Sequence, residues 1–141
     1  MIYRQRLELE AVLPYGVGIE HVSNGNALKL TFNAAHLFNA NSNTITEDAK
    51  HTLRQIAGIL NNNTRSTISI TGYTDNTGRE DYNRTLSERR AGSVYNYLCE
   101  QRVEPTRMEY AGKGKLNPIA TNNRAEGRAY NRRVEIVIKF L

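Results

Sequence analysis

Cysteine and long hydrophobic runs are scarce in this sequence. Its 141 residues include one cysteine, Cys99, so an intramolecular disulfide is excluded. Cys99 is predicted to lie on the outer flank of a helix, with no positioned base beside it, and we interpret it as an ordinary helix residue. No stretch approaches the roughly 20 apolar residues that a membrane helix needs. The first residues, Met1–Arg4, lead into no apolar segment of the kind that a signal peptide contains.

Groupings of residues that support catalysis or metal binding are also missing. The sequence has no HExxH motif, no Ser/His/Asp set and no pair of acids expected in one pocket. His36 and His51 lack the spacing of metal ligands, and we interpret both as surface or loop residues. Residues 112–115 (GKGK) lack the Ser or Thr and the following helix of a phosphate-binding loop. We therefore expect neither an enzyme nor a bound metal or cofactor.

The charge balance is basic, with 19 Lys and Arg against 14 Asp and Glu and a formal net charge of +5. A basic surface attracts anionic partners over long range. Nucleic acid and a bacterial cell wall, with its many carboxylates, are both partners of this kind. Because the sequence contains no recognition helix, zinc finger or RNA-binding aromatic motif, we expect no nucleic-acid partner.

The most informative stretch spans residues 72–98, with the sequence GYTDNTGREDYNRTLSERRAGSVYNYL. It begins as the end of a strand, because residues 67–73 alternate isoleucine with threonine and serine. A cluster of turn-forming residues follows at Asp75–Gly78. A helix is then predicted from about Glu80 to Gln101. The stretch is therefore a strand, a tight turn and a helix in sequence.

Two polar side chains fall within the apolar sector of this helix. The apolar positions of that sector are Leu86, Val94 and Leu98. Asn83 and Arg90 point within about 20° of each other into the same sector, whereas Arg89 points outward. An inward-facing Arg needs a partner, because burying an unpaired charge costs several kcal/mol. The nearest acid expected to meet it is Asp75, at the carboxyl end of the preceding strand.

An Asp75–Arg90 pair at that position has two interpretations of equal standing. Ligands of open α/β layers sit beyond the carboxyl ends of strands, so the pair would hold a zwitterion, with carboxylate on ammonium and guanidinium on carboxylate. Alternatively, the pair is a structural ion pair with no ligand. The residues alone leave both interpretations open.

The remaining elements complete a two-layer arrangement. They comprise a hairpin with an Asn-Gly turn (19–22 and 27–32), a helix with a Thr44–Glu47 capping box (44–60), a short strand (108–111), a helical turn (122–130) and a last strand (132–140). We predict an α/β (α+β) two-layer sandwich, with a mixed parallel/antiparallel sheet and helices on one face. Residues 1–18 are expected to be a linker or pre-strand from an upstream tether, with a short helix as the alternative, and residues 19–141 the domain.

Two long motifs in this sequence resemble those of the OmpA C-terminal-like family of peptidoglycan-binding domains. The first is a signature of the form G-[HY]-T-D-x-x-G-x-x-x-x-N-x-x-L-S-x-x-R-A-x-x-V-x-x-x-L. The sequence matches it at Gly72, Thr74, Asp75, Gly78, Asn83, Leu86, Ser87, Arg90, Ala91, Val94 and Leu98. The second block, residues 123–138 (NRAEGRAYNRRVEIVI), resembles the family's closing motif N-x-x-x-x-G-R-x-x-N-R-R-V, which it matches from Gly127 to Val134. Two motifs in the right order make the resemblance specific.

The resemblance implies non-covalent binding of peptidoglycan at the diaminopimelate of its peptide stem. The free end of that side chain carries one ammonium and one carboxylate, which Asp75 and Arg90 would hold. Asn83 would add a neutral hydrogen bond, and Arg132, placed on the buried side of the last strand by parity, would be a second guanidinium over the pocket. The family has an aromatic residue followed by Asp in the 33–43 loop, and Asn39 takes the place of that Asp.

The resemblance also implies a periplasmic location, at the outer membrane and cell wall of a Gram-negative bacterium. The domain would tether an envelope protein or lipoprotein, and any contact with a membrane would run through a segment outside this chain. The same fold also serves as a protein-interaction module, which is our alternative interpretation, whereas a cell-wall hydrolase is disfavoured for want of catalytic groups. The sequence does not distinguish between three kinds of upstream anchor: a lipid, a β-barrel or a transmembrane helix.

Overall fold

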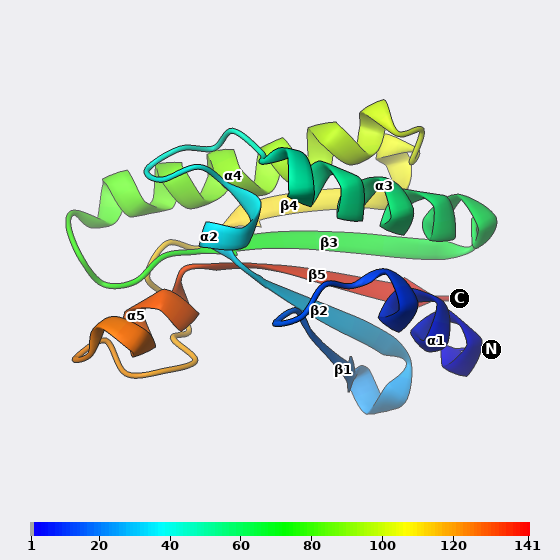
Figure 1. Ribbon diagram of the computed structural model, residues 1–141, viewed down its shortest axis with the longest axis horizontal. Coiled ribbons are helices and arrows are strands. Elements are labelled where there is room, and N and C mark those ends of the chain that lie inside the picture. The colour runs from blue at the N-terminus through cyan, green and yellow to red at the C-terminus, as the bar shows by residue number, and fades with distance from the viewer. Residues whose placement is uncertain (1) are drawn as a thin grey trace.

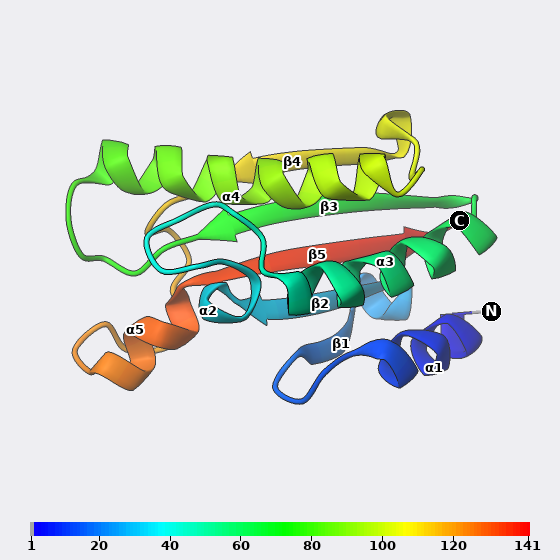
Figure 2. The same ribbon diagram turned by 45° about the horizontal axis from the view of Figure 1, so that its top comes forward.

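The computed structural model describes residues 2–141, which form one mixed sheet with helices packed on one of its faces (Figures 1 and 2). In chain order the elements are α1 (Ile2–Val12), β1 (Gly18–Val22), η1 (Ser23–Gly25), β2 (Ala27–Asn33), α2 (Ala34–Leu37), α3 (Glu47–Asn62), β3 (Ser66–Tyr73), α4 (Glu80–Glu100), η2 (Pro105–Arg107), β4 (Met108–Gly112), α5 (Ala125–Asn131) and β5 (Arg133–Phe140). Among the helices of these residues, none combines the length and the apolar character needed to cross a bilayer.

The five strands lie in the order β1-β2-β5-β3-β4. β3 and β4 are parallel neighbours joined by α4, and every other neighbouring pair is antiparallel. The last strand is therefore inserted at the centre of the sheet, between β2 and β3. This arrangement confirms the predicted mixed sheet with helices on one face.

The core lies between the sheet and α3 and α4 (Figure 2). The stripe predicted for α3 is confirmed, since all four of its members are buried: Ala49, Leu53, Ile56 and Leu60. The predicted start of this helix is wrong by two residues. Thr46, not Thr44, is the N-cap, and its hydroxyl accepts a hydrogen bond from the N–H of Ala49. Thr44 precedes it in an extended segment that pairs with the 37–39 backbone.

The N-terminal segment forms a helix rather than the linker or pre-strand that we favoured for residues 1–18. α1 packs against α3, and its Leu9 is fully buried in the common core. Gln5 is also buried, and its amide donates to the side-chain oxygen of Asn63 at 2.9 Å. The short-helix alternative is therefore the one observed, and Met1 lies outside the described residues. Only two residues of α1 are buried, Gln5 and Leu9. The apolar periodicity that identifies an amphipathic helix is therefore weak in this segment.

A close approach between α4 and the sheet positions the inward face of this helix. Gly72 on β3 and Gly112 on β4 are register partners, and a Cβ on either would overlap the backbone of α4 at Ser87 and Glu88. The Ser87 hydroxyl bridges the two layers, because it accepts from the N–H of Gly114 at 2.9 Å and donates to a carbonyl of its own helix. The absence of side chains at the two glycines thus lets α4 sit directly on the ends of β3 and β4.

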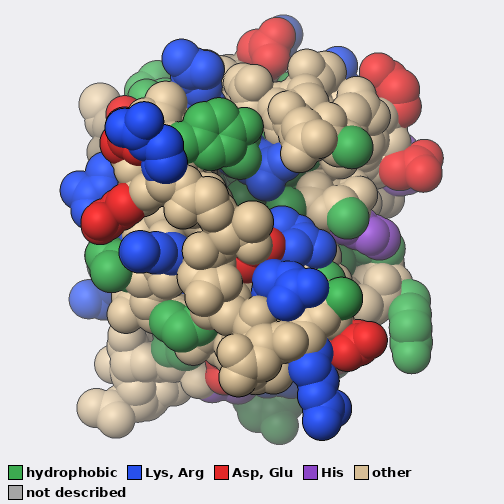
Figure 3. Space-filling view, turned by 90° about the vertical axis from the view of Figure 1, so that its left-hand side faces the viewer, with side chains coloured by type: hydrophobic (Ala, Val, Ile, Leu, Met, Phe, Trp, Pro, Cys, Tyr) green, Lys and Arg blue, Asp and Glu red, His purple; other side chains and the backbone are tan. Residues whose placement is uncertain are grey.

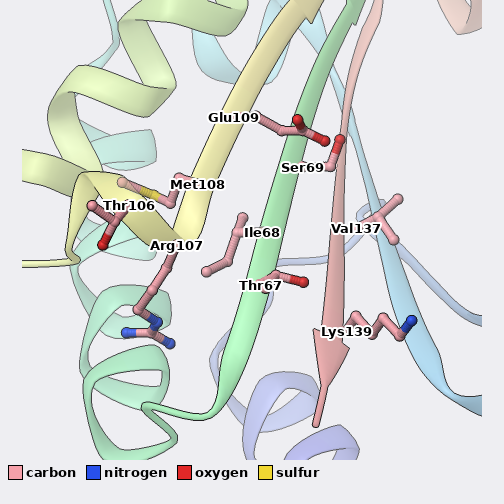
Figure 4. Close-up of a pocket in the computed structure, with 9 residues that line it drawn as sticks. All are labelled: Thr67, Ile68, Ser69, Thr106, Arg107, Met108, Glu109, Val137 and Lys139. Carbon is pink, nitrogen blue, oxygen red and sulfur yellow. The ribbon is translucent and has the colours of Figure 1, made fainter.

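The opposite face of the sheet carries a hollow of about 450 Å³ over β3, β4 and β5 (Figure 4). Arg107 lines this hollow, but its guanidinium turns toward the end of α3. It donates hydrogen bonds of 2.6–3.0 Å to the carbonyls of Leu60, Asn63 and Ser66 and to the Ser66 hydroxyl. Arg107 therefore closes the connection between α3 and β3 through its Nε and Nη2 groups.

Candidate ligand-binding site

A pocket of about 490 Å³ lies beyond the carboxyl end of β3, enclosed by the 39–43 loop, the first half of α4 and α5. Its charged and amide side chains are Asn41, Asp75, Asn83, Arg90, Arg128 and Arg132. Figure 3 views this end of the molecule, where Lys and Arg side chains gather around a hollow in which acidic surface is recessed. Four of the five residues predicted for a site therefore surround one pocket, and Asn39 does not.

Asp75 is the one acidic residue that lines the pocket, and its carboxylate is already engaged. One oxygen accepts from Nη1 of Arg132 at 2.6 Å, and the other accepts from the backbone N–H of Thr77 at 2.8 Å. Burial acts to raise the pKa of Asp75, but the Thr77 N–H and the Arg132 guanidinium outweigh it and hold the pKa below its usual value. The carboxylate is therefore ionised at neutral pH.

Arg90 is buried, as its place on the helix predicts, but its predicted pairing with Asp75 is wrong. Its Nε donates to the backbone carbonyl of Ser42 at 2.9 Å, and its guanidinium carbon lies 5.2 Å from the ring centre of Phe38. The 39–43 loop thus takes the place that we expected Asp75 to fill. Burial lowers the pKa of Arg90, Tyr82 raises it, and the positive charge of Arg132 lowers it further. Arg90 remains a cation without an acidic partner among residues 2–141.

Asn83 holds the turn that carries Asp75. Its side-chain nitrogen donates to the carbonyl of Thr77 at 2.9 Å, across the turn from the start of α4. The turn reverses at Gly78, whose φ of 87° is unfavourable for a residue with a Cβ. One N–H of the Asn83 amide, from which we expected a neutral hydrogen bond to a ligand, is therefore used within the protein, and the side chain still lines the pocket.

Arg132 lies at the junction of α5 and β5, and its side chain is 43% exposed. Its position over the pocket agrees with the parity argument. Arg128 lies four residues earlier on α5, lines the same pocket and donates Nη1 to the carbonyl of Asn122 at 2.9 Å. We did not single out Arg128 from the sequence. The signal was present in the closing motif, because residues four apart share one side of a helix.

The 39–43 loop presents a different residue from the one that we predicted. Asn39 is exposed and outside the pocket, whereas Asn41 lines it. The N–H of Ser42 donates to the carbonyl of Asn39 at 3.1 Å, and Asn41 adopts a φ of 53° within this turn. Asn tolerates this left-handed conformation better than most residues. The turn reverses the chain after Asn39 and brings the second asparagine to the pocket.

Arg133 supports the site from the face of the sheet opposite α3 and α4, which it shares with Glu135. Only 2% of Arg133 is exposed, because the 117–121 segment covers it. Its guanidinium pairs with Glu135 at 2.8 Å and lies 3.9 Å from the ring centre of Tyr73. Buried Asn131 fixes the covering segment by accepting from the N–H groups of residues 119 and 120. These contacts hold α5, and with it Arg128 and Arg132, against the sheet.

Comparisons with known proteins agree with this fold. Residues 37–132 match the OmpA family. Outer membrane protein A of Bordetella avium is 47% identical over 112 residues, which cover 79% of this chain and 58% of that protein. The chain therefore spans little more than half the length of this relative.

Two solved structures show the same architecture over most of their length. The cell wall anchor of the T6SS from Pseudomonas aeruginosa has a TM-score of 0.82 at 28% identity, covering 100% of this chain and 98% of that one. The peptidoglycan-associated lipoprotein from Burkholderia pseudomallei has a TM-score of 0.69 at 28% identity, covering 77% and 89%. Motifs, fold and family match thus point the same way, and the chain belongs to the OmpA family.

Proposed function

We propose that this domain binds peptidoglycan non-covalently, through the diaminopimelate of the peptide stem, and so anchors an envelope protein to the cell wall. The observation that carries the proposal is one pocket that combines an ionised Asp75 with a buried Arg90, which has no acidic partner among residues 2–141. The names of two structural relatives, a cell wall anchor and a peptidoglycan-associated lipoprotein, support it. The proposal includes a periplasmic location, at the outer membrane and wall of a Gram-negative bacterium.

The two charges suit the two ends of the zwitterion. Arg90 uses Nε on Ser42, so both of its Nη groups remain to form a fork with the ligand's carboxylate. The Phe38 ring lies against the guanidinium, and Arg90 is buried. Asp75 accepts one hydrogen bond on each oxygen, and a carboxylate has about four acceptor sites, so it can still receive an ammonium.

Pull-down by insoluble peptidoglycan and calorimetry with free diaminopimelate test the proposal together. Arg90→Ala should abolish measurable binding, because losing one partner of a desolvated charged contact costs about 2–5 kcal/mol. Arg89→Ala is the matched control, since it removes the same charge from the next, exposed position of α4. Arg90→Lys keeps the charge but not the fork, and should bind weakly.

Binding of the wall by Arg90→Ala at the wild-type level, with an unchanged circular dichroism spectrum, would rule out this pocket as the peptidoglycan site. A wild-type domain that binds neither the wall nor diaminopimelate would instead favour the protein-interaction module.

A further inference from the structure

The pocket contains more positive charge than a single zwitterion requires. Three guanidinium groups line it, those of Arg90, Arg128 and Arg132, against one carboxylate, that of Asp75. Within residues 2–141, Asp75 pairs only with Arg132, and neither Arg90 nor Arg128 forms an ion pair. A zwitterion brings one charge of each sign, so it would leave this excess unchanged. A ligand with an additional anionic group would reduce it.

The spare charge also has spare hydrogen-bond donors. A guanidinium has about five N–H donors. Arg128 uses one nitrogen on the Asn122 carbonyl, and Arg132 uses one on Asp75. The remaining donors belong to Arg128, within α5, and to Arg132, at the C-cap of α5, and both side chains line the pocket. Arg90 approaches from the other side, on α4, where the 39–43 loop holds it.

From this arrangement we infer that the pocket binds a second carboxylate of the ligand, beside the one in the zwitterion, and that Arg128 recognises it. The inference rests on the proposed function and adds a specificity to it. Arg90 takes the first carboxylate and Asp75 the ammonium, whereas Arg128 and the free edge of Arg132 form a second fork. The preferred ligand is a stem peptide with a free carboxylate next to its diaminopimelate side chain, and amidation of that carboxylate weakens binding.

Calorimetry with two matched peptides tests the inference on the wild-type domain. One is a short stem peptide that ends in diaminopimelate with both carboxylates free. The other is the same peptide with the carboxylate outside the zwitterion converted to an amide. A hydrogen-bonded charged contact predicts about tenfold tighter binding of the free acid. The preference should shrink at high salt, because the rim of the pocket is open to solvent.

Variants at α5 then assign the effect to one residue. Arg128→Gln should lose most of the preference for the free acid, because only the free edge of Arg132 then remains for the second carboxylate. Arg128→Lys keeps a positive charge without the fork and should retain a smaller preference. Arg124→Gln is the matched control, because it removes an exposed charge from the start of the same helix, outside the pocket. This control should keep the tenfold preference.

The outcomes separate this inference from the proposed function. If the wild type binds acid and amide equally, or if Arg128→Gln keeps the full preference, the second-carboxylate site is overturned and diaminopimelate binding stands. If neither peptide binds, both proposals fail. The comparison of peptides on the wild type needs no variant, so a misfolded Arg128→Gln protein would not prevent a decision.

Discussion

Gly72 and Gly112 stand side by side on β3 and β4, and both face the backbone of α4 at Ser87 and Glu88. This contact sets how near α4 lies to the ends of the strands. Asn83 and Arg90 extend from the same side of α4, so the two glycines also set how far these side chains reach over the pocket. Two missing side chains in the sheet thereby determine the geometry of a charged site on the helix.

Replacing either glycine by alanine should be strongly destabilising. The new Cβ would overlap rigid backbone, and overpacking of this kind costs roughly 1–3 kcal/mol or more. Gly58→Ala is the control, because Gly58 is an exposed position within α3 where an added Cβ would meet only open space. That change should raise stability by roughly 0.5–1 kcal/mol. Urea unfolding measures all three variants, and a Gly72→Ala protein as stable as wild type would contradict the close approach.

The ion pair between Asp75 and Arg132 should appear as a coupling in a double-mutant cycle. Asp75→Asn, Arg132→Gln and the double variant are compared by urea unfolding. We expect an interaction energy of about 1 kcal/mol, at the low end for contacting residues because Arg132 is 43% exposed. The Asp75–Arg90 cycle should be additive within about 0.5 kcal/mol. If the Asp75–Arg90 coupling were instead the larger of the two, the Asp75–Arg90 pair predicted from the sequence would be supported.

Stability should fall in acid through Asp75. The pKa of this carboxyl is lower in the folded protein than the value of 3.8 that it has when free of the fold. The unfolded chain therefore binds the proton first, so the contribution of Asp75 is fully present above that value and is lost as the pH falls through the folded pKa. Asp75→Asn should be less stable than wild type at pH 6, and the difference should narrow toward pH 2. A difference independent of pH would contradict this assignment.

A negative charge at Asn41, rather than at Asn39, should strengthen binding of the ligand's ammonium. The two residues lie in one loop, but only Asn41 lines the pocket. Asn41→Asp should improve the affinity for diaminopimelate by roughly 0.2–1 kcal/mol at low salt, and screening should reduce this gain. Asn39→Asp adds the same charge outside the pocket and should have no measurable effect. Calorimetry at two salt concentrations compares them, and a larger gain at Asn39 would argue against the loop geometry.

Helical periodicity was sufficient to predict which side chains of α4 point inward. It placed Asn83 and Arg90 in the apolar sector, and both are buried, because the direction of a side chain follows from the backbone alone. Periodicity does not specify what an inward side chain contacts. The partner of Arg90 is a carbonyl of a loop 48 residues earlier, and such a contact depends on the path of that loop.

Local turn geometry accounts for the other differences between the residues predicted from the sequence and those that the structure shows. Asn39 and Asn41 are the same residue type two positions apart, and only the turn between them decides which one reaches the pocket. The cap of α3 shifted from Thr44 to Thr46 for a similar reason, since both threonines satisfy the composition of an N-cap. Residue identity alone does not distinguish two such candidates, whereas the backbone does.

The start of α4 and α5, which line the pocket, lie toward the opposite end of the sheet from α1 (Figure 1). A pull between bound cell wall and the N-terminal side of the domain would therefore run lengthwise along the strands. In antiparallel pairs the hydrogen bonds lie across the strand direction, so β2, β5 and β3 would resist such a pull in shear, with many bonds strained at once. With β5 between β2 and β3, the last strand of the chain is then the element through which mechanical load passes from one half of the sheet to the other.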